Sequence, residues 1–334
     1  MTLPDFFLVG APKCGTTAMH AFLRQHPEVF LPEQKELHFF GSDLALPATL
    51  SPETHAALFC DAGGAHRVGE TCIWALYSTE AARAIRAAQP QARIVAMLRN
   101  PVEMMYGLHS EFLYQAIEDI ARFDRALAAE PARHRGRRLP CRGYMPDAIY
   151  FYRAVATFSE QVERYLAAFG PDRVHVILYD DLKRDPAGVY RELLMFLDVD
   201  PSFVPEFSII NPNKRIKSVA LQHALHNPSC RSWKILRRSS REWVQRLILW
   251  ATKWNMSHEP RPPMDPALRR RLEAEFAPEI ERLGRLLGRD LVALWLEKRG
   301  VRPSPGHPAQ PSVPFWSRAA RTSIGWRAST SARP

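Results

Sequence analysis

The 334-residue sequence has no run of about 18 apolar residues, the length that a membrane-spanning helix requires. Its N-terminal stretch lacks both a basic region and a cleavage site, so we do not expect a signal peptide. The five cysteines are scattered, odd in number and free of any C-x-x-C pair, which argues against a disulfide framework and against a zinc ribbon. These absences favour a cytoplasmic globular protein.

Acidic residues are scarce in two segments, and the positive charge of the chain is concentrated there. The formal net charge is +10, and residues 214–255 alone carry +9, from ten basic residues and one acidic residue, Glu242. Residues 301–334 add five arginines and no acid, so the rest of the chain is net negative. Such localised charge predicts an anionic partner, which is a phosphate-bearing ligand, a membrane surface or a nucleic acid.

Short apolar runs alternate with longer segments of helical periodicity. We expect strands over residues 5–10, 93–99 and 174–179. We expect helices over residues 16–25, 100–120, 147–168, 186–197 and within 265–298, and a surface loop over 131–146. This alternation predicts an α/β fold of the P-loop-like, three-layer kind, in which helices flank a central, mostly parallel sheet.

The first expected strand and helix are joined by the segment Gly10-Ala11-Pro12-Lys13-Cys14-Gly15-Thr16-Thr17. A helix N-terminus presents unpaired N–H groups and partial positive charge, and it therefore binds phosphate or sulfate. The two glycines allow the backbone to wrap closely around such an anion. The candidate ligands of the anion are Pro12, Lys13, Cys14, Gly15, Thr16 and Thr17.

This loop differs from the Walker A pattern at one decisive position. The glycine spacing fits, and Thr17 fits the last position, but Thr16 stands where Walker A has its lysine. The lysine lies inside the loop instead, at Lys13. A magnesium-dependent kinase or NTPase is therefore less favoured, and a plain glycine turn with a surface lysine is a further alternative.

The loop FLVGAPKCGTT resembles the 5′-phosphosulfate loop of sulfotransferases that use 3′-phosphoadenosine-5′-phosphosulfate (PAPS). Further segments resemble motifs of that family, several of them from its heparan-sulfate-type branch, and they follow in the expected order. They are KELHFF at 35–40, GET at 69–71, RNPVE at 99–103, YDDL at 179–182, FAPE at 276–279 and LGRDL at 287–291. Together these motifs span about residues 5–298.

The resemblance implies a bacterial-type, PAPS-dependent sulfotransferase without a metal. Such an enzyme moves a sulfuryl group onto a hydroxyl or amine, here of a carbohydrate or small metabolite, and releases PAP. Two alternatives stay open beside it: a P-loop nucleotide kinase or NTPase, and a non-catalytic member of the fold that binds PAP or an anionic membrane.

The resemblance also implies roles for four residues. Lys13 would neutralise charge on the leaving PAP oxygen, a contribution on the order of several kcal/mol. Glu36 matches the glutamate that serves as general base in the heparan-sulfate-type branch. His38 is an alternative base, because unperturbed histidine titrates near neutral pH. Glu70 is a further candidate, which would orient the acceptor or Lys13.

The 3′-phosphate of PAPS would bind at Arg99, since arginine suits bidentate phosphate recognition. The family places a serine eight residues later, where this chain has Gly107, and Ser110 is the candidate replacement one helical turn further on. A basic loop in the family closes over the same phosphate, and its counterparts here are Lys214, Arg215 and Lys217.

Residues 233–254 combine basic residues with tryptophans, of which three share a helical face with Leu247. We expect this face to pack on the catalytic domain as a lid over the acceptor cleft, within a lid segment 213–262. The alternative is peripheral contact with an anionic membrane. We expect no nucleic-acid partner. The predicted organisation is one catalytic domain over 1–300 and a disordered tail over 301–334.

Overall fold

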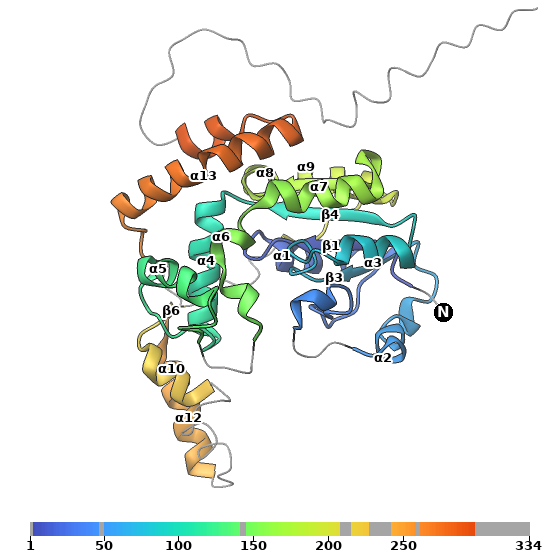
Figure 1. Cartoon of the computed structure of the whole chain (residues 1–334). Coiled ribbons are helices and arrows are strands. Elements are labelled where there is room, and N and C mark those ends of the chain that lie inside the picture. The colour runs from blue at the N-terminus through green and yellow to red at the C-terminus, as the bar shows by residue number, and fades with distance from the viewer. Residues whose placement is uncertain are drawn as a thin grey trace, which may run out of the picture.

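The structure is a computed structural model that describes residues 3–46, 50–140, 145–207, 215–226, 242–257 and 261–297. Five strands form one parallel sheet in the order β2-β3-β1-β4-β5 (Figure 1). Their bounds are β1 Phe6–Gly10, β2 Val29–Phe30, β3 Arg67–Thr71, β4 Arg93–Leu98 and β5 Val174–Leu178. The predicted α/β fold with a parallel central sheet is confirmed.

Helices connect and cover these strands, and a separate antiparallel pair joins β6 (Arg215–Ile216) to β7 (Met256–Ser257). None of the described helices has both the length and the apolar character that crossing a bilayer requires. The helices are α1 Thr16–Leu23, α2 Pro52–Ala57, α3 Ala81–Ala88, α4 Pro101–Tyr114, α5 Phe123–Arg133, α6 Tyr152–Val155, α7 Phe158–Phe169, α8 Tyr179–Arg184, α9 Pro186–Leu197, α10 Val219–His226, α12 Glu242–Asn255 and α13 Pro266–Leu287.

The strand order places helices on both faces of the sheet. The chain moves one way along the sheet from β1 through α1 to β2, and the other way from β3 through α3 to β4. Because such crossovers are right-handed, opposite directions put α1 and α3 on opposite faces. Helices α3, α7 and α13 pack in succession in one layer, and α9 joins α1 through the Tyr190 hydroxyl, which donates to the Phe22 carbonyl at 3.2 Å. The molecule therefore has three layers, with the sheet between two layers of helices.

The central strand β1 forms the middle of the core. All five of its residues are buried, as is typical of a parallel strand covered on both faces. Gly69 on β3 lies directly beside Phe6, and a Cβ atom there would come within 2.1 Å of the phenyl ring. A glycine at this position therefore leaves the room that the central phenylalanine occupies.

Local capping signals set several helix starts as expected. Asn100 precedes Pro101 and accepts hydrogen bonds from the N–H groups of Val102 and Glu103, at 2.9 and 3.3 Å. Asp265 caps α13 in the same way, since its Oδ1 accepts from the Leu268 N–H at 2.8 Å. Because Asn100 directly follows Arg99, this cap also positions the arginine at the start of α4.

The expected helix over 147–168 is not continuous. A 3₁₀ turn, Asp147–Tyr150, is followed by α6 and then by α7, and the chain leaves helical angles at Phe151 and Thr157. Helix α5 ends at Arg133, so it takes up the start of the loop expected over 131–146. Helix α4 ends at Tyr114, six residues before the expected end.

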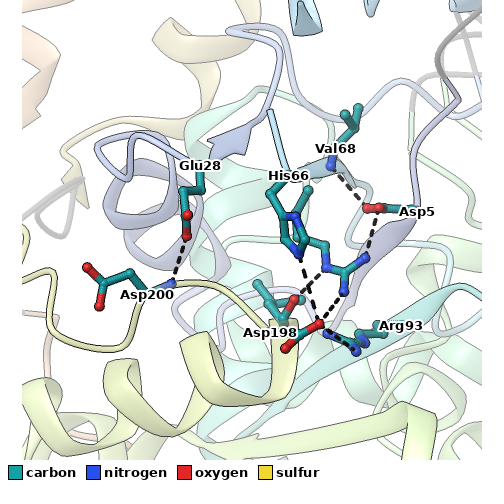
Figure 2. A network of polar contacts seen from close by, with 9 residues as sticks. Asp5, Glu28, His66, Val68, Arg93, Asp198 and Asp200 are labelled. Carbon is teal, nitrogen blue, oxygen red and sulfur yellow. Dashed lines mark hydrogen bonds and ion pairs between the residues drawn. The ribbon is translucent and has the colours of Figure 1, made fainter. Parts of the chain in front are cut away.

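A polar network ties the amino ends of the strands together (Figure 2). Arg67 begins β3, and its guanidinium lies 3.3 Å from Asp5 and 3.2 Å from Asp198, which follows α9. Arg93 begins β4 and lies 3.8 Å from the same Asp198 carboxylate. The Asp5 carboxylate also accepts from the Val68 N–H at 3.0 Å. These contacts lie at the opposite edge of the sheet from the loop after β1.

Candidate functional site

The carboxyl ends of the parallel strands carry the predicted phosphate loop and its surroundings. Gly15 is the N-cap residue of α1, at φ 94°, and it makes no side-chain cap, so it leaves the N–H groups of the first turn for another partner. A Cβ atom on Gly15 would lie 3.1 Å from the ring of Tyr179, which follows β5. Open sheets of this kind bind ligands in the crevice outside the carboxyl ends of their strands.

Inside the loop, the side chains of several predicted ligands are buried, so Cys14 and Thr16 would contact an anion through their backbone N–H groups, whereas Pro12 has no N–H to donate. Pro12, Cys14 and Thr16 are buried. Burial raises the pKa of the Cys14 thiol to about 12, so this thiol stays protonated. Thr16 holds the Walker lysine position and is 4% exposed, whereas the Thr17 hydroxyl accepts a hydrogen bond from Lys35 Nζ at 2.7 Å. Lys13, at φ 60°, is the lysine of the loop itself.

Lys13 forms an ion pair with Glu111 of α4, with 2.9 Å between Nζ and Oε2. Glu111 belongs to none of the sequence motifs and was not among the predicted site residues. The signal that would have found it is its spacing, because it lies four residues after Gly107 and therefore on the same helical face. Helix α4 thus supplies the counter-ion of the loop lysine.

Two arginines lie beside this pair. The Arg99 guanidinium stacks on the ring of Tyr179 at 4.8 Å, and that of Arg261 stacks on Tyr106 at 5.0 Å. Burial, together with the positive charge of Arg99, lowers the pKa of Arg261. Its buried Nε has no hydrogen-bond partner among the described residues. Two neighbouring guanidiniums, one with an unsatisfied buried donor, form a site suited to a phosphate.

Gly107 lies between Lys13 and Arg261. A Cβ atom there would be 3.3 Å from Lys13 Cβ and 3.5 Å from Arg261 Nη2. Ser110 does not take its place, because its hydroxyl donates to the Tyr106 carbonyl at 3.0 Å. Ser110 instead lines a neighbouring cavity of about 790 Å³ together with Arg261 and Lys217.

The predicted basic loop is only partly described. Lys214 lies outside the described residues, and for Arg215 the structure describes only its place in strand β6. Lys217 is exposed, and its ammonium lies 5.1 Å from the centre of the Trp254 ring. Of the three predicted basic residues, Lys217 is therefore the one whose side chain is seen to line the cavity. Arg261 was missed because a single arginine between prolines shows no periodicity or motif.

The second half of the site is the KELHFF segment beside the end of β3. Glu36 and His38 both have positive φ, at 61° and 51°, a backbone state often held at functional sites. The Glu36 carboxylate accepts from the Ile73 N–H at 2.9 Å and lies 3.6 Å from Lys35 Nζ. Burial raises the pKa of Glu36, with the nearby charge of Lys35 opposing the rise.

His38 contacts Cys72, with Nδ1 and Sγ 3.4 Å apart, and burial lowers the pKa of this histidine. Within the described part of the chain, Glu36, His38 and Cys72 bring possible metal-ligand atoms within 4.8 Å of one another. Burial also raises the pKa of the Cys72 thiol, which keeps it protonated and a poor ligand. Transfer without a metal stays a prediction.

Glu70 has a different surrounding from the other candidates. It is 2% exposed, and its carboxylate contacts His55 Nε2 at 2.8 Å. His55 in turn stacks on Phe39 of the KELHFF segment, with 3.9 Å between ring centres. Glu70 therefore helps to position that segment, and its charge contributes to the raised pKa of Glu36.

Known proteins resemble this chain in sequence and in structure. The model of the sulfotransferase domain family matches residues 3–246. A solved sulfotransferase from Alicyclobacillus acidocaldarius is 29% identical, covers 88% of this chain and 99% of its own, and superposes with a TM-score of 0.66. The human bifunctional heparan sulfate N-deacetylase/N-sulfotransferase 3 is 27% identical over 60% of this chain.

The membrane-associated sulfotransferase kil1 of Dictyostelium discoideum is 20% identical over 76% of this chain and 67% of its own. By contrast, the chain spans only 23% of the length of the human heparan sulfate relative. That resemblance therefore concerns a single domain within a longer protein. Because the family model matches well over half of the sequence, the chain belongs to the sulfotransferase domain family.

Proposed function

We propose that this protein transfers a sulfuryl group from PAPS to an acceptor hydroxyl or amine. The observation that carries the proposal is the convergence of Lys13, Arg99 and Arg261 at an open helix N-terminus. The buried Nε of Arg261, which has no hydrogen-bond partner within the described ranges, supports an anion at this place, because a buried donor without a partner costs free energy. PAPS carries two anionic groups, a 5′-phosphosulfate and a 3′-phosphate. The helix N-terminus with Lys13 would hold the first, and the two arginines would hold the second.

The donor would bind in two parts. The loop from Gly10 to Thr17 and the N-terminus of α1 would hold the 5′-phosphosulfate, and Arg99 with Arg261 would hold the 3′-phosphate. Bound PAPS supplies an activated sulfuryl group whose S–O bond to phosphate breaks as the acceptor oxygen or nitrogen attacks in line. Lys13 would neutralise the negative charge that then develops on the phosphate oxygen.

The acceptor would lose its proton to a side chain of the KELHFF segment. Glu36 is the proposed general base, because its raised pKa brings the carboxylate closer to the pH at which a base works best. His38 is the alternative base, and its lowered pKa keeps the ring neutral. Glu70 is proposed as a positioning residue that acts through His55 and Phe39.

We propose a carbohydrate or a small metabolite as the acceptor. Two human relatives are named for carbohydrates, the heparan sulfate N-sulfotransferase and carbohydrate sulfotransferase 15, the second being 31% identical over 34% of this chain. These names suggest a hydroxyl or amine of a sugar as the first acceptor to test.

The kinase or NTPase alternative is less favoured by the same geometry. It needs a cation at the position of Thr16, which is buried and carries none. A non-catalytic member of the fold is the second alternative, and Gly107 is the feature that favours it, because the family's serine hydroxyl is missing there. Both alternatives make different predictions for ligand binding and turnover.

The test is isothermal titration of the full chain with PAP, and separately with ATP and Mg²⁺. We expect micromolar or tighter PAP binding, with at least tenfold losses in Lys13→Ala, Arg99→Ala and Arg261→Ala. Arg285→Ala is the matched control, since this exposed arginine pairs with Glu281, at 3.9 Å, near the C-terminal end of α13. A PAPS-dependent screen of sugar acceptors follows.

Each outcome decides between the alternatives. PAP binding with turnover of a sugar acceptor supports the sulfotransferase. PAP binding without turnover of any acceptor favours the non-catalytic member. Absence of PAP binding by a folded protein, or tighter binding of ATP and Mg²⁺ than of PAP, overturns the proposal.

A further inference from the structure

Helix α12 exposes an unusual concentration of large apolar side chains. The large apolar residues exposed in the described part of the chain lie mostly on this one helix. They are 50–62% exposed there, and they are Trp243, Leu247, Leu249, Trp250 and Trp254. The expectation that this tryptophan face packs on the catalytic domain is therefore wrong. Its tryptophans face outward instead.

The exposed residues form a continuous stripe. Trp243, Leu247, Trp250 and Trp254 are spaced by four, three and four residues, which places them on one face of an α-helix. Arg246 and Lys253 are also exposed and lie along one side of this stripe. The helix therefore presents tryptophan, leucine and basic side chains together to the surroundings.

The opposite face of α12 is held by α10 and the short β6–β7 pair. Asn255 is fully buried, and its side-chain amide donates to Gln222 at 2.9 Å and to the Ser218 carbonyl at 3.0 Å. Its carbonyl oxygen Oδ1 accepts from the Ser218 N–H at 2.8 Å, and Val244 is buried as well. These contacts hold one face of α12 against its neighbours and so determine which face points outward. Figure 1 shows α10 and α12 extending away from the sheet, beyond α4 and α5.

The sequence charge and the described basic residues of α12 together indicate what its outward face contacts. Residues 214–255 carry a net charge of +9 in the sequence. On α12, the described basic residues Arg246 and Lys253 are exposed, and the acid Glu242 is exposed beside Arg246. Basic residues near an anionic bilayer strengthen binding to it. Tryptophan prefers the membrane–water interface, and leucine next to it suits acyl chains rather than stacked bases.

We propose that α12 docks its tryptophan face onto an anionic lipid surface. The helix would lie in the plane of the interface, with its apolar side chains inserted and Arg246 and Lys253 at the level of the headgroups. Helix α12 would make a peripheral contact with the membrane and would not span it. This proposal does not depend on the sulfotransferase activity, because it rests on residues outside the donor site.

The test is co-sedimentation of the full chain with vesicles of phosphatidylcholine alone and of phosphatidylcholine with about 30% phosphatidylglycerol, an anionic surface of the kind such helices bind. We expect binding to the anionic vesicles only, and at least a tenfold weaker partition coefficient for Trp243→Ser/Trp250→Ser. The matched control is Met195→Ser/Val204→Ser, which removes two apolar residues that are 56% and 69% exposed elsewhere on the surface. This control should bind as the wild type does.

A second variant tests the electrostatic part. Arg246→Glu/Lys253→Glu should weaken binding by a similar factor, and about 0.5 M salt should weaken wild-type binding, because salt screens charges near the surface. Brominated lipids should quench the wild-type tryptophan emission more strongly than that of Trp243→Ser/Trp250→Ser. PAP affinity, measured on every variant, should stay unchanged and reports that the catalytic domain is intact.

Three results would overturn the proposal. The first is equal vesicle binding by the wild type and the tryptophan variant. The second is equal binding to neutral and anionic vesicles. The third is a wild-type dimer that ignores vesicles and that the tryptophan variant converts to a monomer in light scattering, since the face would then be a contact between two copies of this chain.

Discussion

Lys13 of the phosphate loop and Glu111 of α4 are paired across the candidate donor site, with Nζ and Oε2 2.9 Å apart and each side chain exposed by about a quarter. The pair keeps the loop lysine in place without any bound anion. An anion that enters the loop must share Lys13 with this carboxylate or displace it. The Glu111 charge therefore opposes the binding of the donor while it holds the lysine ready.

We expect Glu111→Gln to bind PAP more tightly than the wild type, by about three- to tenfold, because the change removes a negative charge beside an anion site. Isothermal titration at low salt measures the difference, which should shrink at about 0.5 M salt. Glu281→Gln, in an exposed pair on α13, is the control and should change nothing. Weaker PAP binding by Glu111→Gln would mean that the carboxylate serves mainly to orient Lys13.

Gly107→Ser introduces a hydroxyl at the position where the family has a serine that would hold the 3′-phosphate. Its Cβ would lie 3.3 Å from Lys13 Cβ, so the neighbour has to move by a few tenths of an ångström. Gly107→Ala is the matched control, because it has the same Cβ without the hydroxyl. We expect the serine variant to bind PAP about fivefold more tightly than the alanine variant, as one hydrogen bond contributes about 1 kcal/mol. Equal affinities of the two would place the 3′-phosphate elsewhere.

The pH dependence of turnover should follow Glu36. Burial raises the pKa of this carboxyl, and a general base must be deprotonated. The rate should therefore rise with pH through a pKa above the ordinary glutamate value. Glu36→Gln should lose about 10²- to 10⁴-fold in rate and lose this acidic limb, with PAP affinity kept. A limb that persists in Glu36→Gln and disappears in His38→Gln would assign the base to the histidine.

The same shift has a consequence for stability. Because the pKa of Glu36 is raised in the folded protein, the unfolded chain releases this proton first as pH rises through 4.5. The folded state then loses stability until the pH passes the raised pKa of the folded protein. Glu36→Gln should therefore raise the melting temperature at about pH 7.5 and raise it less at about pH 4. Glu33→Gln, at an exposed position two residues before the KELHFF segment, serves as control. A lower melting temperature for Glu36→Gln at the higher pH would contradict the raised pKa.

The network at the amino edge of the sheet should matter for stability alone. Arg67→Ala removes the partner of Asp5 and Asp198 and leaves the Leu197 carbonyl without its donor. We expect a loss of about 1–3 kcal/mol in the free energy of unfolding, measured by urea denaturation. PAP affinity should be unchanged, because the network lies at the edge of the sheet away from the phosphate loop. A comparable loss in Arg83→Ala, an exposed pair on α3, would show that the effect is not specific.

The parts of the fold that local chemistry determines were predictable from the sequence. The buried strand β1, the glycine loop and the start of α4 at Asn100-Pro101 each depend on neighbouring residues only. The break of the expected 147–168 helix was not predictable, since Phe151 and Thr157 leave helical angles in a segment whose apolar periodicity continues. Tertiary packing overrides the local preference there.

The candidate site also has residues that the sequence predicted and residues that it did not. Lys13, Glu36 and Arg99 lie in motifs, and their neighbourhood follows from the strand order. Arg261 and Glu111 reach the site through contacts between segments far apart in the sequence, so no motif identifies them, and only the spacing of four residues after Gly107 points to Glu111. The tryptophan periodicity of α12 was visible, but which face is covered depends on where α10 lies. The hydrogen bond from Asn255 to Gln222 holds α12 against α10 and so determines the covered face, and it is a tertiary contact.

The burial of Cys14 limits how this loop can be reached chemically. Although the thiol lies in the middle of the phosphate loop, it is fully covered and protonated, so alkylating reagents, oxidants and cysteine-directed covalent inhibitors should leave it unmodified. Cys60, in contrast, is exposed shortly after α2, outside the phosphate loop, and should react with ordinary maleimides. A fluorophore attached at Cys60 would therefore label the folded protein without occupying the donor site.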